Sequence, residues 1–169
     1  MQSRRLTRSF VQQIHARPEQ VFPLLCPERE KDWLPGWDAQ MIHSASGVAE
    51  RGAVFTSPHE ARLSGDRPHD NGQIVWLVTE YDPPRCIAFA RWQPDGLVVQ
   101  LDISLGRHHG GETAVCIRYD YTATNDAGLA ALTKLTPDAW LNNMGFWQES
   151  MNRWFANLEP ATSPPPPAR

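Results

Sequence analysis

The sequence of 169 residues lacks the short motifs that mark common catalytic and cofactor sites. It contains no GxSxG nucleophile elbow, no GxGxxG or Walker phosphate loop, no HExxH pair and no EF-hand calcium loop. Its three cysteines, Cys26, Cys86 and Cys116, form no CxxC pair, which excludes a zinc ribbon and a thioredoxin-like motif. We therefore expect neither a metal ion nor a cofactor, and the sequence identifies no catalytic residue.

Long apolar runs and strong net charge are also missing. No run of about 18 apolar residues is present, so we expect no membrane span. No apolar segment of the signal-peptide kind follows the basic start over 1–8, which favours a cytoplasmic protein with reduced thiols. Cys86 and Cys116 lie in apolar, strand-like runs, so we expect both side chains to be buried. The formal net charge of −3 argues against a general nucleic-acid binder.

What the sequence does have is the composition of one globular domain. Hydrophobic residues make up 41% and charged residues 21%, and a chain of this length buries roughly two thirds of its unfolded surface. We expect a single domain over 1–160. Residues 161–169 include four successive prolines, which suit neither a helix nor a central strand, so we expect a disordered Pro-rich tail.

Hydrophobic spacing predicts a strand, two short helices, six further strands and a helical C-terminal part. The first strand covers 6–14, the short helices cover 18–25 and 28–33, and the six strands cover 39–46, 53–57, 73–81, 85–93, 97–105 and 114–121. Apolar and polar residues alternate most strictly over 97–105, as in a strand buried on one face. Short loops between successive strands favour an antiparallel meander.

The C-terminal part carries clear helix signals. Asn125 or Asp126 can cap a short helix through Lys134. Thr136 and Pro137 then combine a cap residue with a first-turn proline. Beyond them, apolar residues from 140 to 158 recur at spacings of 3, 4 and 7, which makes one apolar stripe over about five turns. We expect a long helix that buries this stripe.

Several segments, in this order, resemble the SRPBCC superfamily of START-related, polyketide-cyclase-like proteins. Residues 14–22 resemble the passage from its first strand into its first helix, and 30–37 resemble the segment after its second short helix. Residues 76–84 resemble its central strand and following turn, and the apolar C-terminal helix completes the set. The resemblance covers about 5–158. It implies an α+β helix-grip fold: a seven-stranded curved antiparallel sheet wraps a long C-terminal helix, with two short helices between strands 1 and 2.

Such a fold leaves a cavity between sheet and helix that is mostly apolar with a few polar groups. The residues that we expect to contact a hydrophobic small-molecule ligand there are Trp37, Met41, His43, Trp76, Val78, Phe89, Arg91, Leu101, Ile103, Ile117, Tyr119, Tyr121, Met144, Trp147 and Met151. Each apolar member could instead be ordinary core packing. The facing of the strands that carry His43, Trp76 and Arg91 is ambiguous from the sequence.

Two polar residues in this set carry alternatives. His43 and Arg91 share strand parity with Met41 and Phe89. If that face points inward, His43 is a candidate acid or base and Arg91 an anchor for a carboxylate or enolate. If it points outward, both are surface residues.

Three further segments also carry alternatives. Trp33 and Trp37 flank a Pro-Gly turn, so they either line the cavity mouth or hold the second short helix. Residues 57–72 form either a lid over the cavity or a disordered loop. The histidines beside Glu112 at a glycine-rich hairpin indicate a solvated turn rather than a metal site.

Three functions fit these expectations, and superfamily members share a fold far better than a function. The first is a non-catalytic carrier or sensor of a hydrophobic molecule such as a lipid, a quinone or a polyketide-like ring. The second is an enzyme of the cyclase or dehydratase type, favoured by an inward-facing group of His43, Arg91 and Tyr119. The third is a co-chaperone-like interaction module, favoured by a dry or filled cavity. A monomer or weak homodimer is expected.

Overall fold

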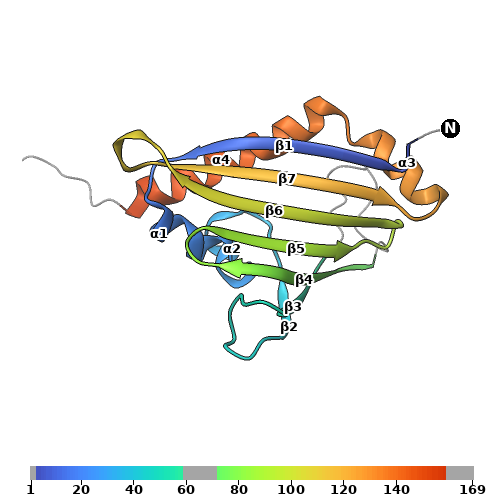
Figure 1. Ribbon diagram of the computed structural model, residues 1–169, viewed down its shortest axis with the longest axis horizontal. Helices are drawn as coiled ribbons and strands as arrows, with labels where there is room; N and C mark the ends of the chain where they lie inside the picture. The colour runs from blue at the N-terminus through green and yellow to red at the C-terminus, as the bar shows by residue number, and fades with distance from the viewer. Residues whose placement is uncertain (1–2, 59–71, 159–169) are drawn as a thin grey trace, which may run out of the picture.

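The computed structural model describes residues 3–58 and 72–158 and shows a seven-stranded antiparallel sheet with a long helix along one face (Figure 1). The strands are β1 (Arg5–Ile14), β2 (Gln40–His43), β3 (Val54–Pro58), β4 (Gln73–Asp82), β5 (Cys86–Trp92), β6 (Leu97–Arg107) and β7 (Thr113–Ala123). Their order in the sheet is β1-β7-β6-β5-β4-β3-β2. The predicted antiparallel meander is confirmed for β2 to β7, and β1 pairs with β7 at the other edge of the sheet.

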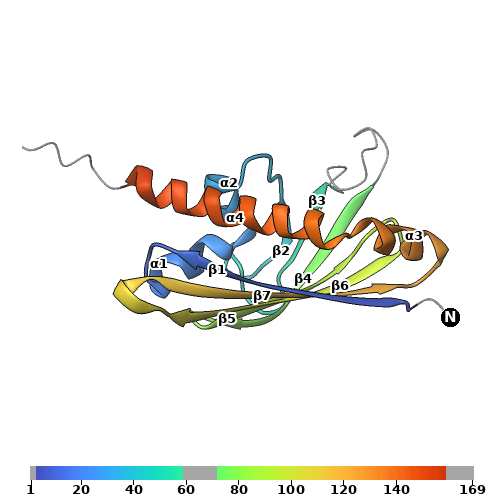
Figure 2. The same ribbon diagram turned by 90° about the horizontal axis from the view of Figure 1, so that it is seen from above.

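The helices occupy the two predicted places in the chain. Between β1 and β2 lie α1 (Pro18–Val21), the 3-10 turn η1 (Phe22–Leu25) and α2 (Pro27–Trp33). After β7 come α3 (Asp126–Lys134) and α4 (Pro137–Leu158), and a 3-10 turn, η3 (His109–Gly111), joins β6 to β7. Figure 2 shows α4 lying over the sheet, with β3 and β4 rising toward it. The predicted α+β helix-grip fold is confirmed.

Local chemistry accounts for where these helices begin. The Asn125 side chain accepts a hydrogen bond from the Gly128 amide at 2.9 Å, which caps α3 as predicted. Pro18 and Pro27 stand in the first turns of α1 and α2, where a missing N–H leaves no bond unmade. The long helix is held to the sheet edge by polar bonds, one of them from Gln12 Nε2 to the Met144 carbonyl at 3.0 Å.

Strand alternation decides which side chains face α4. Along β6, Leu97, Val99 and Leu101 are buried while Gln100 and Asp102 are exposed. The register sets inner-face residues of neighbouring strands opposite one another, so they form rows that run across the sheet. Two of these rows, described below, decide where space remains.

Two local predictions are wrong. The strand expected over 39–46 covers only Gln40–His43, because the chain turns after it and the Ala45 and Ser46 amides donate to the Glu50 carboxylate. Cys116 is exposed and Cys86 only half-buried, because their strand neighbours Ile117 and Ile87 take the inner face. All three cysteines are free thiols.

Some expectations fall where the structure gives no description. The Pro-rich tail over 161–169 and residues 59–71 of the candidate lid lie outside the described residues. Within 3–58 and 72–158, no helix is both long enough and apolar enough to cross a membrane.

Candidate functional site

A cavity of about 90 Å³ lies between the inner face of the sheet and helices α2 and α4. Its sheet wall consists of Phe55, Ser57, Ile74, Trp76, Phe89, Arg91, Gln93, Leu101, Tyr119 and Tyr121. Its other wall consists of Pro27, Glu30, Leu34, Trp37, Trp140, Asn143 and Trp147. Eight of these 17 residues are aromatic, so a bound molecule would meet ring faces and edges on several sides.

Trp76 on β4 is the centre of the first aromatic cluster. Its ring stacks on Phe55 of β3, with centroids 5.3 Å apart and an interplanar angle of 13°. Phe89 and Trp37 meet it edge to face, each with a centroid distance of 6.0 Å. The Trp76 indole N–H donates to Ser57 Oγ at 2.9 Å, which fixes the orientation of the ring. The four rings form a rigid, preformed wall.

A second cluster joins the sheet to α4. Tyr119 stacks on Tyr121 along β7 with centroids 5.5 Å apart and an angle of 12°. The Trp140 ring, from the first turn of α4, meets Tyr119 edge to face at 6.3 Å. Burial raises the pKa of the Tyr121 hydroxyl above its usual value, although the positive charges of Arg91 and Arg8 oppose this shift. Tyr121 therefore stays protonated at neutral pH and can donate a hydrogen bond.

Arg91 on β5 brings a positive charge to this apolar wall. Its guanidinium carbon lies 4.7 Å from the centroid of the Trp76 ring and 5.6 Å from that of Tyr119. Its Nε is buried and finds no hydrogen-bond acceptor in the described parts of the chain. A second charged residue, Glu30 of α2, is also buried at the cavity, with 6% of its surface exposed. The cavity thus combines aromatic walls with a small number of strongly polar groups.

Rows across the sheet explain why the cavity is confined to one end of it. Ile87, Ile103 and Ile117 lie opposite one another on β5, β6 and β7, and we call them the isoleucine row. Each is at most 2% exposed. Four residues further along β5, Arg91 lies opposite Trp76 on β4 and Val99 on β6, and Val99 lies opposite Tyr121. We call these four the arginine row. Aliphatic side chains fill the first region, whereas large flat rings leave space beside the second.

The residues predicted from the sequence divide accordingly. The eight that line the cavity are Trp37, Trp76, Phe89, Arg91, Leu101, Tyr119, Tyr121 and Trp147. Their contact with a ligand stays a prediction.

The other seven predicted residues do not line the cavity. Five of them are fully buried in the surrounding core: Val78, Ile103, Ile117, Met144 and Met151. They do face inward, but they lie in regions that other side chains fill. Met41 is half-buried on β2 and packs against the core.

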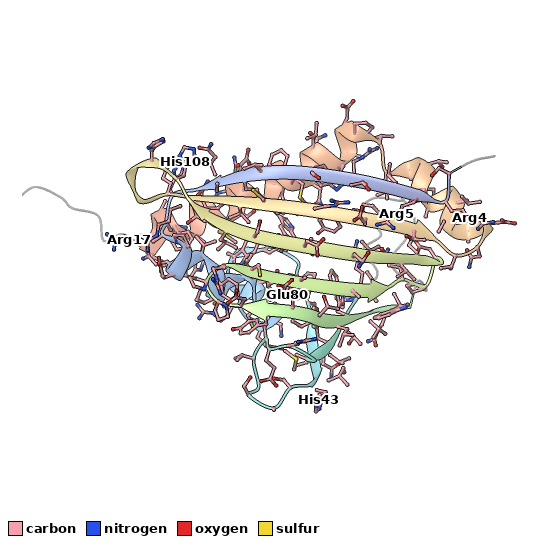
Figure 3. The ribbon with its side chains drawn as sticks, in the orientation of Figure 1. Arg4, Arg5, Arg17, His43, Glu80 and His108 are labelled. Carbon is pink, nitrogen blue, oxygen red and sulfur yellow. The ribbon has the colours of Figure 1, made fainter. Side chains whose placement is uncertain are left out.

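His43 is exposed at the end of the edge strand β2 and points away from the sheet (Figure 3). The register shift after Met41 breaks the alternation that linked the two residues. Arg91 faces inward with Phe89 and lines the cavity, whereas His43 does not. The group of His43, Arg91 and Tyr119 that favoured an enzyme is therefore not assembled.

Both alternatives for the two tryptophans of the Pro-Gly turn are realised. Trp33 is buried and donates from its indole to the Leu24 carbonyl at 2.8 Å, which ties α2 to η1. Trp37 lines the cavity and donates to the Pro27 carbonyl at 2.9 Å.

The hairpin histidines are exposed, as expected for a solvated turn. Glu112 beside them pairs instead with His15, at 2.7 Å. No group of three potential metal ligands occurs in the described parts of the chain.

Sequence reasoning missed nine lining residues: Pro27, Glu30, Leu34, Phe55, Ser57, Ile74, Gln93, Trp140 and Asn143. A signal existed for some of them. Trp140 lies seven residues before Trp147 on the apolar stripe of α4, so both occupy one face. Phe55 and Ser57 share strand parity on β3, as Ile74 and Trp76 do on β4. For Glu30, an acidic helix residue, the sequence carries no sign of burial.

No protein-family model and no curated protein matches this sequence. Solved structures do match its fold. Norcoclaurine synthase from Thalictrum flavum, in complex with dopamine and hydroxybenzaldehyde, has a TM-score of 0.64 at 10% identity over 92% of this chain and 89% of that one. Ara h 8.0201 has a TM-score of 0.63 at 12% identity over 90% and 99%. A protein from Rhodobacter sphaeroides has a TM-score of 0.64 at 19% identity over 90% and 93%.

These likenesses concern the fold. The chain has the Bet v 1-like helix-grip fold, as the resemblance of its segments implied. At 10–19% identity, the neighbours carry no residue roles over to this chain.

Proposed function

We propose that this chain binds a small, hydrophobic, ring-containing molecule in the cavity between the sheet and α4. The observation that carries the proposal is the set of eight aromatic residues around one preformed cavity. An aromatic pair contributes about 0.5–1.5 kcal/mol beyond the burial of its area, so a ring in this space gains from several walls at once. Rigid walls also reduce the ordering that binding requires.

The size of the cavity favours a ring over a long acyl chain. A water molecule needs roughly 10–15 Å³ of such space, and an apolar cavity of roughly 150 Å³ holds benzene. A cavity of about 90 Å³ is smaller than that, so it accepts at most one ring, with the remainder of the molecule at its mouth. Among the lipid, quinone and polyketide-like ligands considered above, the single-ring kinds fit best.

A structural neighbour supports this size class. The norcoclaurine synthase structure contains dopamine and hydroxybenzaldehyde, which are both single-ring compounds. The helix-grip fold can therefore hold molecules of this size, although that protein shares only 10% of its residues with this chain.

One observation keeps an enzyme as the second candidate. Glu30 is a buried carboxyl group at the cavity wall, and carboxyl groups are common proton-transfer residues. Conversion of a bound ring compound that is lost in Glu30→Gln would favour catalysis. The interaction module loses its main reason, because the cavity is not filled by side chains.

The test is a titration with p-cresol, a neutral single-ring probe, followed by amide NMR shifts and tryptophan fluorescence. The informative variant is Asn143→Phe, which places a ring in the cavity from α4. Its matched control is Asn142→Phe, because Asn142 is the preceding, exposed residue of the same helix. We expect saturable binding by the parent and the control, and a loss of at least about tenfold in Asn143→Phe. Equal binding by both variants, or no saturable binding by the parent, would overturn the proposal.

A further inference from the structure

Arg91 is the single positively charged residue among the described residues that line the cavity. Burying a guanidinium is unfavourable unless its N–H groups find acceptors. The buried Nε of Arg91 has no acceptor among residues 3–58 and 72–158. No carboxylate in that same part of the chain forms an ion pair with Arg91, because every described arginine pair involves another residue. Arg91 thus lines the cavity with a positive charge and with one buried N–H that has no acceptor in that part of the chain.

The rings around Arg91 determine how it can be used. The guanidinium carbon lies over the Trp76 ring at 4.7 Å and over the Tyr119 ring at 5.6 Å. Rings cover the faces of a planar cation, and its hydrogen bonds leave from its edge, in the plane. A ligand in the cavity would therefore meet Arg91 through the edge of its guanidinium. Two parallel N–H groups at such an edge match the two oxygens of a carboxylate.

The same row contains a second possible donor, two strands away from Arg91. Tyr121 lines the cavity, and the charge of Arg91 acts on its hydroxyl. Because this hydroxyl stays protonated, it can add a second donor to the cavity wall. The cavity therefore has an acceptor-binding end at the arginine row and ring-binding walls around it.

We propose that the molecule bound in this cavity is a small aromatic carboxylic acid, with its ring between the aromatic walls and its carboxylate on the guanidinium of Arg91. This inference rests on the proposed function, since it names the chemical class of the same ligand. Glu30 at the α2 wall makes the opposite assignment, an aromatic amine, the direct competitor.

The experiment compares three single-ring probes of similar size: benzoate, benzamide and benzylamine, titrated at pH 7 and followed by NMR. Benzamide keeps the ring and the planar substituent of benzoate but lacks its charge. We expect the parent protein to bind benzoate at least about tenfold more tightly than benzamide, because charge-assisted bonds are roughly twice as strong as neutral ones. Benzylamine should bind more weakly than benzamide.

The variants Arg91→Met and Arg91→Lys test whether the preference for benzoate over benzamide depends on the Arg91 side chain. Arg91→Met should bind benzoate and benzamide about equally, while Arg91→Lys should keep a reduced preference, since it retains the charge but not the planar edge. Arg51→Met is the matched control, because it removes the same charge from an exposed position, and it should behave as the parent does.

The outcomes separate the two proposals. Equal binding of benzoate and benzamide by the parent would overturn the acid assignment and leave the ring-binding function standing. Tighter binding of benzylamine would overturn it in favour of Glu30. Failure of all three probes and of p-cresol would overturn both proposals. The parent comparison requires no variant, so the inference stays testable even if Arg91→Met does not fold.

Discussion

The isoleucine row and the arginine row lie on the same inner face of the sheet, four residues apart along β5. The first belongs to the filled core, and the second borders the cavity. In the isoleucine row, aliphatic side chains meet across three strands, and nothing is left open. In the arginine row, a guanidinium lies over a tryptophan ring, and Trp76, Arg91 and Tyr121 border the cavity. Burial alone therefore does not mark a binding residue. The shape and polarity of neighbours in one row decide whether inward-facing side chains form core or site.

The largest expected effect on stability separates the rows most clearly. Ile103→Ala should lower the free energy of unfolding by about 2–5 kcal/mol, because it leaves a void in a filled region. Its affinity for p-cresol should stay within twofold of the parent's, since Ile103 does not line the cavity. Urea unfolding and the NMR titration check the two parts. A strong loss of binding in a variant that remains folded would show that the rows are not separate.

A smaller effect on stability is expected at the cavity wall. Trp147 is half-buried and meets Trp33 edge to face at 5.8 Å. Trp147→Ala should cost less than the 3–5 kcal/mol of a fully buried tryptophan, because one side of the ring already borders open space. The larger cavity should improve binding of a two-ring probe, 2-naphthol, relative to p-cresol.

The matched control for that change is Trp92→Ala. Trp92 is 46% exposed on the outer face of β5, so its loss should leave the relative affinity for the two probes unchanged. An unchanged preference in Trp147→Ala as well would mean that α4 does not shape the cavity there.

The smallest effect on stability is expected on the outer face of the sheet, where polar side chains pair with one another. Asp120 accepts a hydrogen bond from Thr7 and forms ion pairs with Arg118 at 3.1 Å and Arg5 at 3.2 Å. These contacts, led by the Thr7 hydrogen bond, hold the pKa of the Asp120 carboxyl below its usual value. A lowered pKa stabilises the fold above the unfolded-state pKa of about 3.9, and the stabilisation is lost as the pH falls through the folded pKa.

Asp120→Asn should therefore lower the free energy of unfolding at pH 7 by on the order of 1 kcal/mol. Between pH 5 and pH 2.5 the parent should lose more stability than the variant does. Urea unfolding across that range checks this, with Asp102→Asn as the control from an exposed position of β6. Parallel curves for parent and Asp120→Asn would contradict it.

The fold could be predicted in nearly all its elements, because each depends on local signals. Alternation over β6, the Asn125 cap and the prolines at helix starts all act within a few residues. The short strand β2 was the exception. Its register shift depends on pairing with β3, which residues 39–46 alone do not reveal.

The site could be predicted only in part, for a different physical reason. Period two tells which face a residue takes but not how far along the sheet the core is filled. The sequence therefore predicted both Ile103 and Leu101 as ligand contacts, although only Leu101 lines the cavity. The inward position of Arg91 could be offered only as one of two alternatives, and the burial of Glu30 depends on where α2 packs.

The most direct test of the account is a crystal structure of the protein with 4-bromophenol, a neutral ring whose bromine can be located by anomalous scattering. We expect a bromine peak between the arginine row and α4, with the ring against Trp76 or Trp140. Peaks confined to the surface at saturating concentration, with the cavity free of the ring, would contradict the claim that this space is a ligand site.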